Sequence, residues 1–163
     1  MTIQSFLRAN IPHANKVAKQ YGIPSLVTLA MAAWESGWGK KAPQYNYFGY
    51  TAPTNYSGKR QLLKTVEYHK TATVKYPVII RIEDIGSKYK YIVKRWFKAY
   101  KSPTESFTDY AKLIKGSGRY ADAFDYTDDP AQMLREICEG GYATNPEYIK
   151  GVLSVLKSIE NHL

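Results

Sequence analysis

Residues 22–40 read GIPSLVTLAMAAWESGWGK, and this stretch decides how the chain folds. Its apolar residues recur at the spacing that brings them to one face of a helix. They are Leu26, Leu29, Ala30, Ala33 and Trp34. Pro24 suits the first turn of such a helix, and Gly37 is a typical stop. The pattern predicts a buried helix that runs straight into a glycine-rich turn.

Glu35 lies in the last turn of this predicted helix, between Trp34 and Trp38. The negative end of the helix dipole and an apolar wall both disfavour a charge, so both raise the pKa of the carboxyl. No cation adjoins it in sequence before Lys40. Such a carboxyl holds its proton near neutral pH, as a general acid must. The alternative is a glutamate that merely ends a helix.

The rest of the sequence predicts a helical body interrupted once by a small β lobe. This is an α+β fold with a cleft between the two parts. Residues 2–21 have helical periodicity, in one piece or in two that break near Pro12, with Gly22 as the stop. From about residue 43 to about residue 100, glycine, proline and β-branched residues replace that periodicity. Within this lobe, YPVIIRIE and YKYIVKRWFKAY predict a hairpin, and Pro77 favours an edge position for the first strand.

Three further helices are predicted by their start signals. Each begins with a capping residue followed by proline: Ser102, Asp129 and Asn145. Glu105, three residues after Ser102, completes a capping box. Gly140 is expected to stop the second of these helices.

Composition and charge narrow the function classes. The 163 residues carry a formal charge of +9, which favours a polyanion such as nucleic acid, anionic lipid or bacterial cell wall. No helix-turn-helix signature, zinc spacing or RNP-like motif supports nucleic acid. The single Cys138 excludes an internal disulfide, and the three scattered histidines suggest no metal site, so no metal or cofactor is expected. The chain is expected to be a single domain and a monomer.

The second candidate carboxylate is Glu67 in KTVEYHK, within the β lobe. Glycoside hydrolysis commonly uses two carboxylates, one that protonates the leaving oxygen and one that stabilises or attacks the sugar or activates water. Two lobes that each supply one carboxylate would suit that chemistry. The alternative is that Glu67 is an exposed strand residue paired with Lys64 or Lys70.

Five segments together resemble a known family. GIPSLVTLAMAAWESGWGK, NYFGY, RWFKAYKSPTESFTDYAKLI, RYADAF and GGYATNPEY occur in the order found in glucosaminidases of glycoside hydrolase family 73, which include flagellar peptidoglycan hydrolases and many autolysins. The resemblance covers about residues 3–159. It implies a lysozyme-like fold and hydrolysis of the β-1,4 bond between N-acetylglucosamine and N-acetylmuramic acid, with N-acetylglucosamine at the new reducing end.

The same resemblance implies site residues. Glu35 matches the general acid of the family's ESGWG motif, Tyr142 matches a tyrosine that lines the cleft, and Glu67 matches a proposed second catalytic residue. A mechanism assisted by the substrate's own acetamido group stays open. The substrate-binding residues expected from these motifs are Trp38, Asn46, Phe48, Tyr120 and Asn145.

The sequence departs from the family pattern at several positions. Met31 stands where many members carry glutamine, one turn before Glu35, and this change is expected to remove a hydrogen bond from the cleft. Asn145 replaces an aspartate and can still cap a helix. Tyr47 and Tyr50 replace aliphatic residues, and residues 68–94 form a longer segment than usual.

These observations leave rival functions open. A muramidase or lytic transglycosylase could share the fold, and a non-catalytic wall-binding module could keep the cleft without the chemistry. The expected partners are peptidoglycan glycan strands and anionic wall polymers. The start MTIQSFLRANIPH lacks the apolar core of a signal peptide, and no stretch is long and apolar enough to span a bilayer. The expectation is a wall-acting protein released by phage, carried on a phage particle or exported by dedicated machinery.

Overall fold

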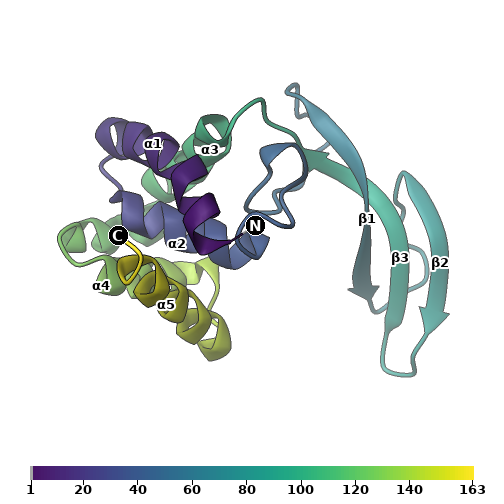
Figure 1. Ribbon diagram of the computed structural model, residues 1–163. Helices are drawn as coiled ribbons and strands as arrows, with labels where there is room; N and C mark the ends of the chain where they lie inside the picture. Colours follow the sequence, from purple (N-terminus) through teal and green to yellow (C-terminus); the bar gives the residue numbers. More distant parts are fainter. Residues whose placement is uncertain (1) are drawn as a thin grey trace. The chain divides into compact units, whose positions relative to one another are not determined.

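The computed structural model describes residues 2–163, which fall into two compact units. The helical unit comprises residues up to Phe48 and from Tyr100 onward, and the β unit, Gly49–Ala99, is inserted between these two parts of the chain (Figure 1). Inside the helical unit, the backbone N–H of Tyr100 donates to the carbonyl of Gln44 at 2.9 Å. This bond holds the two chain segments that flank the insertion next to each other.

The predicted α+β, lysozyme-like architecture is confirmed, although the β lobe begins later than expected. It starts at Gly49 instead of residue 43, because the preceding residues pack with the helices. Residues Pro43–Tyr45 form a short 3-10 turn, and the ring of Phe48 stacks on that of Tyr110 at 4.6 Å. The single-domain organisation stays a prediction.

Within residues 2–163, five α-helices, two 3-10 segments and one π-turn build the helical unit. The helices are α1 (Ile3–Tyr21), α2 (Ser25–Ser36), α3 (Pro103–Gly116), α4 (Pro130–Ile137) and α5 (Pro146–Glu160). The 3-10 segments η1 (Pro43–Tyr45) and η2 (Gly118–Tyr126) and the π-turn η3 (Cys138–Tyr142) connect them. No helix among residues 2–163 combines the length and apolar character that crossing a membrane requires.

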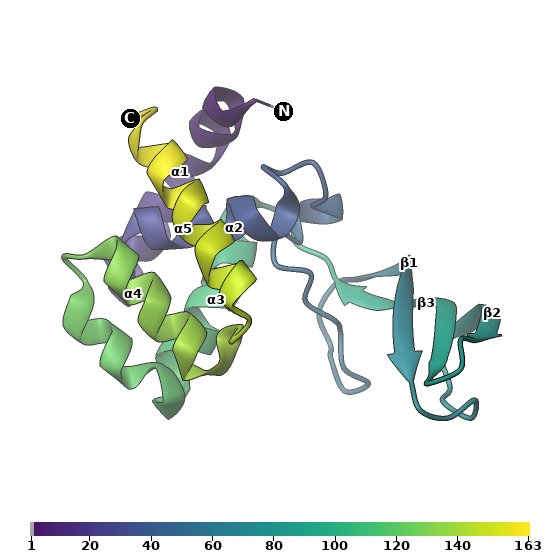
Figure 2. The ribbon, with the colours of Figure 1, turned by 90° about the horizontal axis from the view of Figure 1, so that it is seen from below.

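Helix α2 forms the centre of this unit, packed against α1, α3, α4 and α5. Figure 2 shows α5 lying beside it. All seven residues from Val27 to Ala33 are buried, because a helix surrounded by other helices must be apolar on every side. The predicted buried stripe omitted Val27, which is buried, and included Trp34, which is 38% exposed.

Helix α1 is one continuous helix that passes through Pro12. Proline removes the hydrogen bond that the carbonyl of Arg8 would otherwise accept. Both Pro12 and Arg8 are exposed, so water can bond to the freed carbonyl and the helix continues. Gly22 ends α1 in the left-handed conformation, as predicted.

The predicted caps of the last three helices are present. The side chains of Ser102, Asp129 and Asn145 each accept a backbone N–H from the first turn of their helix. The capping box is only half formed: the carboxylate of Glu105 accepts from the N–H of Lys101 at 2.8 Å, one residue before the cap. Helix α4 ends at Ile137, and the expected stop at Gly140 falls inside η3.

The β unit is a three-stranded antiparallel sheet in the order β1-β3-β2. Its strands are β1 (Arg60–His69), β2 (Val78–Asp84) and β3 (Tyr89–Lys98). The predicted hairpin corresponds to β2 and β3, and the strand that follows Pro77 is an edge strand as predicted. The sequence did not delimit β1, which pairs with β3 along its whole length.

Candidate active site

The turn that follows α2 is built by backbone conformation and by one buried serine. Gly37, Trp38 and Gly39 all have positive φ, at 57°, 60° and 82°, which reverses the chain sharply after Ser36. The Ser36 hydroxyl donates to the Ala32 carbonyl at 2.5 Å and accepts the Gly39 N–H at 2.8 Å. Glycine adopts this left-handed region at little cost, so Gly37 ends the helix at Ser36, one residue after Glu35.

The Glu35 carboxyl has a pKa raised from its ordinary value. The main cause is desolvation by surrounding protein atoms, and the hydroxyl of Tyr148 opposes it by donating to Oε1 at 2.6 Å. Although the residue as a whole remains exposed, its carboxyl is therefore partly withdrawn from water. A carboxyl that keeps its proton and still faces solvent can deliver that proton to a ligand.

Helix α5 brings Tyr148 to Glu35 by close packing on α2. Asn145 caps α5, with Oδ1 accepting the Glu147 N–H at 2.9 Å, and Tyr148 follows in the first turn. The Tyr148 ring meets the Trp34 ring edge-on, with centroids 5.9 Å apart. A Cβ at Gly151 would lie only 2.2 Å from the Trp34 ring, so glycine is what permits this approach.

Two sulfur-containing side chains lie near this pair. Met31 is buried one turn before Glu35, with Sδ 3.7 Å from the Tyr148 hydroxyl oxygen. Thioether sulfur is a weak acceptor, so Met31 offers the tyrosine proton a second, weaker partner. Burial raises the pKa of the Cys138 thiol to about 11, and the charges of Glu139 and Glu35 add to this effect. Cys138 is therefore a packed thiol and not an activated nucleophile.

Tyr142 lies at the end of η3, and its ring is half-buried. The ring meets those of Tyr110 and Tyr120 at centroid distances of 5.9 Å and 6.5 Å. The tyrosine hydroxyl that contacts Glu35 is that of Tyr148. The resemblance emphasised Tyr142 within GGYATNPEY, whereas the structure adds the last tyrosine of the same segment.

The predicted substrate-binding residues occupy different environments. Asn46, Phe48 and Tyr120 are buried, with exposed fractions of 3%, 6% and 4%. Trp38 is half-buried and meets the Phe6 ring edge-on at 5.6 Å. Asn145 is exposed at the α5 cap. Contact of these residues with substrate stays a prediction; three of them have little surface left to offer.

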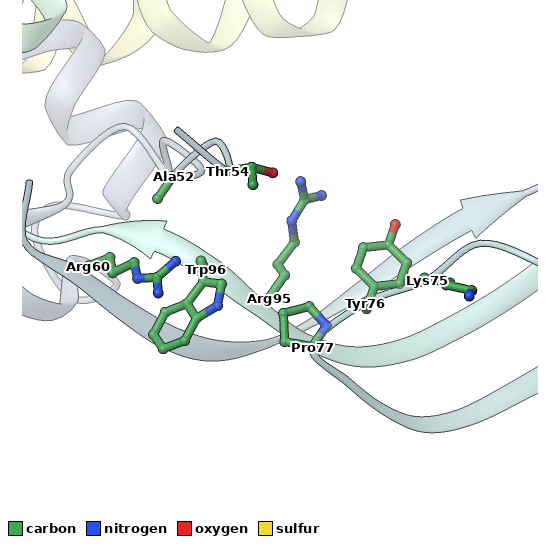
Figure 3. A pocket seen from close by; sticks show the side chains of 8 residues that line it. All are labelled: Ala52, Thr54, Arg60, Lys75, Tyr76, Pro77, Arg95 and Trp96. Carbon is green, nitrogen blue, oxygen red and sulfur yellow. The ribbon is translucent and has the colours of Figure 1, made fainter. Parts of the chain in front are cut away.

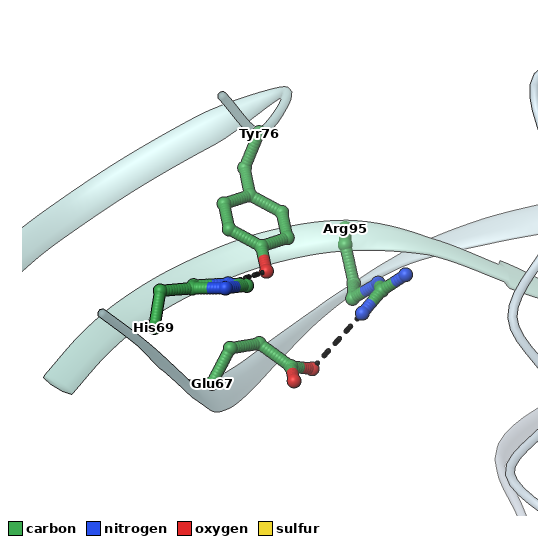
Figure 4. A network of polar contacts seen from close by, with 4 residues as sticks. All are labelled: Glu67, His69, Tyr76 and Arg95. Carbon is green, nitrogen blue, oxygen red and sulfur yellow. Dashed lines mark hydrogen bonds and ion pairs between the residues drawn. The ribbon is translucent and has the colours of Figure 1, made fainter. Parts of the chain in front are cut away.

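Glu67 lies in the β unit, on β1, and its partner is neither of the predicted lysines. Arg95 Nη1 forms an ion pair with Glu67 Oε1 at 3.1 Å, and both side chains are about one-third exposed (Figure 4). Lys64 lies three residues from Glu67 on β1, so strand alternation directs it to the opposite face, and Lys70 lies beyond the end of β1.

Two more side chains complete this cluster. The Tyr76 hydroxyl and His69 Nε2 are hydrogen-bonded at 2.5 Å, and the Arg95 guanidinium lies 5.6 Å from the centroid of the Tyr76 ring (Figure 4). Desolvation and the charge of Glu67 raise the pKa of the Tyr76 hydroxyl. Neither Tyr76 nor Arg95 was predicted from the sequence as a site residue, although both belong to the predicted lobe.

The two candidate carboxyls, Glu35 and Glu67, are carried by different units. No group of three or more His, Cys, Asp or Glu within residues 2–163 is arranged to hold a metal ion.

Comparisons with known proteins identify the family of this chain. A family model described as mannosyl-glycoprotein endo-beta-N-acetylglucosaminidase, or glucosaminidase, matches residues 11–161. Peptidoglycan hydrolase FlgJ of Vibrio cholerae is 30% identical over 162 residues, which cover 96% of this chain and 43% of the relative. An autolysin of Enterococcus faecalis is 30% identical over 145 residues, which cover 83% of this chain and 17% of that protein. The chain thus spans less than half the length of these relatives.

Two solved structures of glycan-cleaving or peptidoglycan-cleaving proteins are similar to this chain. The C-terminally truncated glycoside hydrolase domain of Salmonella typhimurium FlgJ matches with a TM-score of 0.78 and 28% identity, covering 98% of this chain and 99% of that one. A mutant of a peptidoglycan hydrolase from Sphingomonas sp. A1 matches with a TM-score of 0.70 and 32% identity, covering 98% of this chain and 99% of that one.

Proposed function

The chain belongs to the glucosaminidase family of endo-beta-N-acetylglucosaminidases, and from this we propose that it hydrolyses the glycan strands of bacterial peptidoglycan. The proposed bond is the β-1,4 linkage that leaves N-acetylglucosamine at the new reducing end. The observation that supports this most strongly is the Glu35 carboxyl, partly desolvated and bonded to Tyr148 at 2.6 Å. FlgJ and autolysin relatives support the choice of peptidoglycan as substrate.

Glu35 is the proposed general acid. It donates its proton to the glycosidic oxygen as the bond from that oxygen to the sugar's anomeric carbon breaks. The leaving sugar departs as a neutral alcohol, and Glu35 becomes a carboxylate. At that moment the Tyr148 hydroxyl donates to the new charge, so the hydrogen bond is strongest when the negative charge has developed.

Glu67 is the proposed second carboxylate. Its Oε1 is held by Arg95 Nη1 at 3.1 Å, and its carboxylate is proposed to take a proton from attacking water or to stabilise positive charge on the sugar ring. Attack by the substrate's own acetamido oxygen is the alternative route to the same product. Tyr142 is proposed to position substrate, and Trp38 and Asn145 to border it.

The basic surface is proposed to add affinity for anionic wall polymers. The formal charge of +9 attracts carboxylates and phosphates of the wall over several ångströms. Because such attraction between exposed charges is screened, binding to purified walls should weaken as salt is raised from about 0.01 M to about 1 M.

Product analysis tests the proposed reaction. Purified peptidoglycan is digested by the wild type, by Glu35→Gln, and by Glu160→Gln as a control that removes an exposed acid from the end of α5. The products are reduced with borohydride and identified by mass spectrometry. We expect reduced N-acetylglucosamine ends from the wild type and the control, and a loss of about 10²- to 10⁴-fold in rate for Glu35→Gln.

The other products discriminate between the rival functions. Reduced N-acetylmuramic acid would identify a muramidase, and anhydro ends would identify a lytic transglycosylase. Retention on purified walls without any product would identify a binding module. Glu35→Gln that folds and digests walls at the wild-type rate would exclude Glu35 as the acid.

A further inference from the structure

A pocket of about 340 Å³ lies entirely within the β unit (Figure 3). It opens beside the start of β2, where the residues before Val78 run along the edge of β3. Three cations line it, Arg60, Lys75 and Arg95, together with the apolar surfaces of Tyr76, Pro77 and Trp96. Its size lies in the range of sites that take small molecules or single residues of a polymer.

The charges around the pocket favour an anion. Among residues 2–163, no Asp or Glu lines it. Within residues 2–163, the only ion pair made by a residue that lines the pocket joins Arg95 Nη1 to Glu67 Oε1, at 3.1 Å. Three cations against this one carboxylate leave an excess of two positive charges. A guanidinium carries five N–H donors, so Arg95 retains donors that can bind a second oxyanion.

The walls favour an anion that is carried on a larger body. The Arg60 guanidinium lies over the Trp96 ring, 4.0 Å from its centroid, which holds the cation in place against an aromatic surface. Tyr76 and Pro77 add further apolar surface, as Figure 3 shows. A free inorganic ion would leave these surfaces in contact with water, whereas a sugar or peptide would cover them.

The pocket shares two side chains with the cluster around Glu67. Arg95 pairs with Glu67 and also lines the pocket, and Tyr76 lines it while hydrogen-bonding to His69. A ligand group bound to Arg95 would therefore lie within one side chain of the proposed second carboxylate. This proximity favours a group that belongs to the reacting strand over a separate polymer.

We propose that this pocket binds a carboxylate of the peptide or lactyl groups carried by the peptidoglycan strand. The proposal rests on the proposed function for the identity of the polymer. The cations that line the pocket, Arg60, Lys75 and Arg95, attract the carboxylate by their excess of positive charge, and Trp96, Tyr76 and Pro77 offer apolar surface to the body that carries it. The enzyme thereby recognises strands that bear peptide, in addition to the sugars between which it cuts.

The test follows the Trp96 indole N–H signal in two-dimensional ¹⁵N NMR spectra. The chain has three tryptophans, so each indole signal can be assigned by a Trp→Phe substitution. The probes are an N-acetylmuramyl peptide with free carboxylates, its fully amidated analogue, and glycerol phosphate. The test variant is Arg60→Gln with Lys75→Gln. The control is Lys64→Gln with Lys94→Gln, which removes the same charge from exposed cross-strand neighbours outside the pocket.

We expect the free-carboxylate peptide to shift the Trp96 signal, with at least a tenfold loss of affinity in the test variant and less than a twofold loss in the control. Both variants must retain the amide spectrum of the folded sheet. An equal response to the amidated analogue, or no response to the peptide, would overturn the proposal. A response to glycerol phosphate alone would reassign the pocket to an anionic wall polymer.

This result is independent of hydrolysis. A Trp96 shift in a protein that releases no reducing ends would refute the proposed function and keep the pocket. Reducing ends without the shift would refute the pocket and keep the proposed function.

Discussion

The hydroxyl of Tyr148 is the contact that most directly sets the acidity of Glu35, and Tyr148→Phe removes it alone. The ring remains to pack edge-on against Trp34 at 5.9 Å. Since the hydroxyl donates to the carboxylate at 2.6 Å, it stabilises the ionised form and opposes the effect of burial. Its removal should therefore raise the pKa of Glu35 further.

The size of this change follows from the geometry. A hydrogen bond to a charged group contributes about 1.5–3 kcal/mol. Because Glu35 is exposed, water replaces part of the lost bond, and we take about 1 kcal/mol as the remainder. One kcal/mol corresponds to roughly a fivefold change in the ionisation constant, or about 0.7 pH unit.

The assay is the pH profile of kcat/KM on soluble peptidoglycan fragments between about pH 4 and pH 9. Activity should fall as pH rises through the pKa of Glu35, because the general acid must be protonated, and this descending limb should move to higher pH in Tyr148→Phe. Tyr126→Phe, which removes an exposed tyrosine's hydroxyl from η2, is the control for loss of a phenol. A limb that keeps its place or moves to lower pH would refute the role assigned to Tyr148.

Three further predictions concern stability and reactivity. Folding raises the pKa of Glu35, so the folded chain holds this proton more tightly than the unfolded chain, and this contribution to stability is lost as pH rises above about 4.5. The Tm of Glu35→Gln minus that of the wild type should therefore grow from pH 4 to pH 8. A constant difference in Tm would contradict this prediction. In Gly151→Ala, the new Cβ would lie 2.2 Å from the Trp34 ring, so the ring must move by about 1.2 Å to reach a contact of 3.4 Å. We expect this overpacking to lower the free energy of unfolding by about 1–3 kcal/mol, offset by about 1 kcal/mol of helix propensity. The Trp34 indole signal should shift, and an unmoved signal would exclude this packing. The Cys138 thiol, with a pKa near 11, should resist an aromatic disulfide reagent at pH 8 until denaturant is added, and rapid native labelling would show that it is not buried.

The parts of the fold that the sequence predicted are those that depend on local chemistry. Gly37 ends α2, and Asp129 and Asn145 cap their helices, because a left-handed glycine or a capping side chain acts within a few residues. Strand β1 depends instead on pairing with β3, about thirty residues away, so its own sequence did not delimit it. The exposed position of Pro12, which lets α1 continue, is likewise set by tertiary packing.

In the candidate site, too, local features could be predicted from the sequence and long-range contacts could not. Glu35 could be found from its place between tryptophans at a helix end. Tyr148 could not, because it lies 113 residues along the chain and reaches Glu35 only when α5 packs on α2. Its one sequence signal was its place at the end of GGYATNPEY. Strand alternation could have excluded Lys64 as the partner of Glu67, but choosing Arg95 required the register of β1 on β3.

The bond between Tyr100 and Gln44 has a thermodynamic consequence for the insertion it closes. Residues 49–99 form a loop whose ends the helical unit already holds together. The entropy of closing a flexible loop grows only with the logarithm of its length, so doubling the insertion costs about 0.6 kcal/mol. The insertion can thus be lengthened, shortened or replaced at little cost to the helices that carry Glu35. Under the proposed function, specificity for different cell walls can change in this way while the proposed acid stays in place.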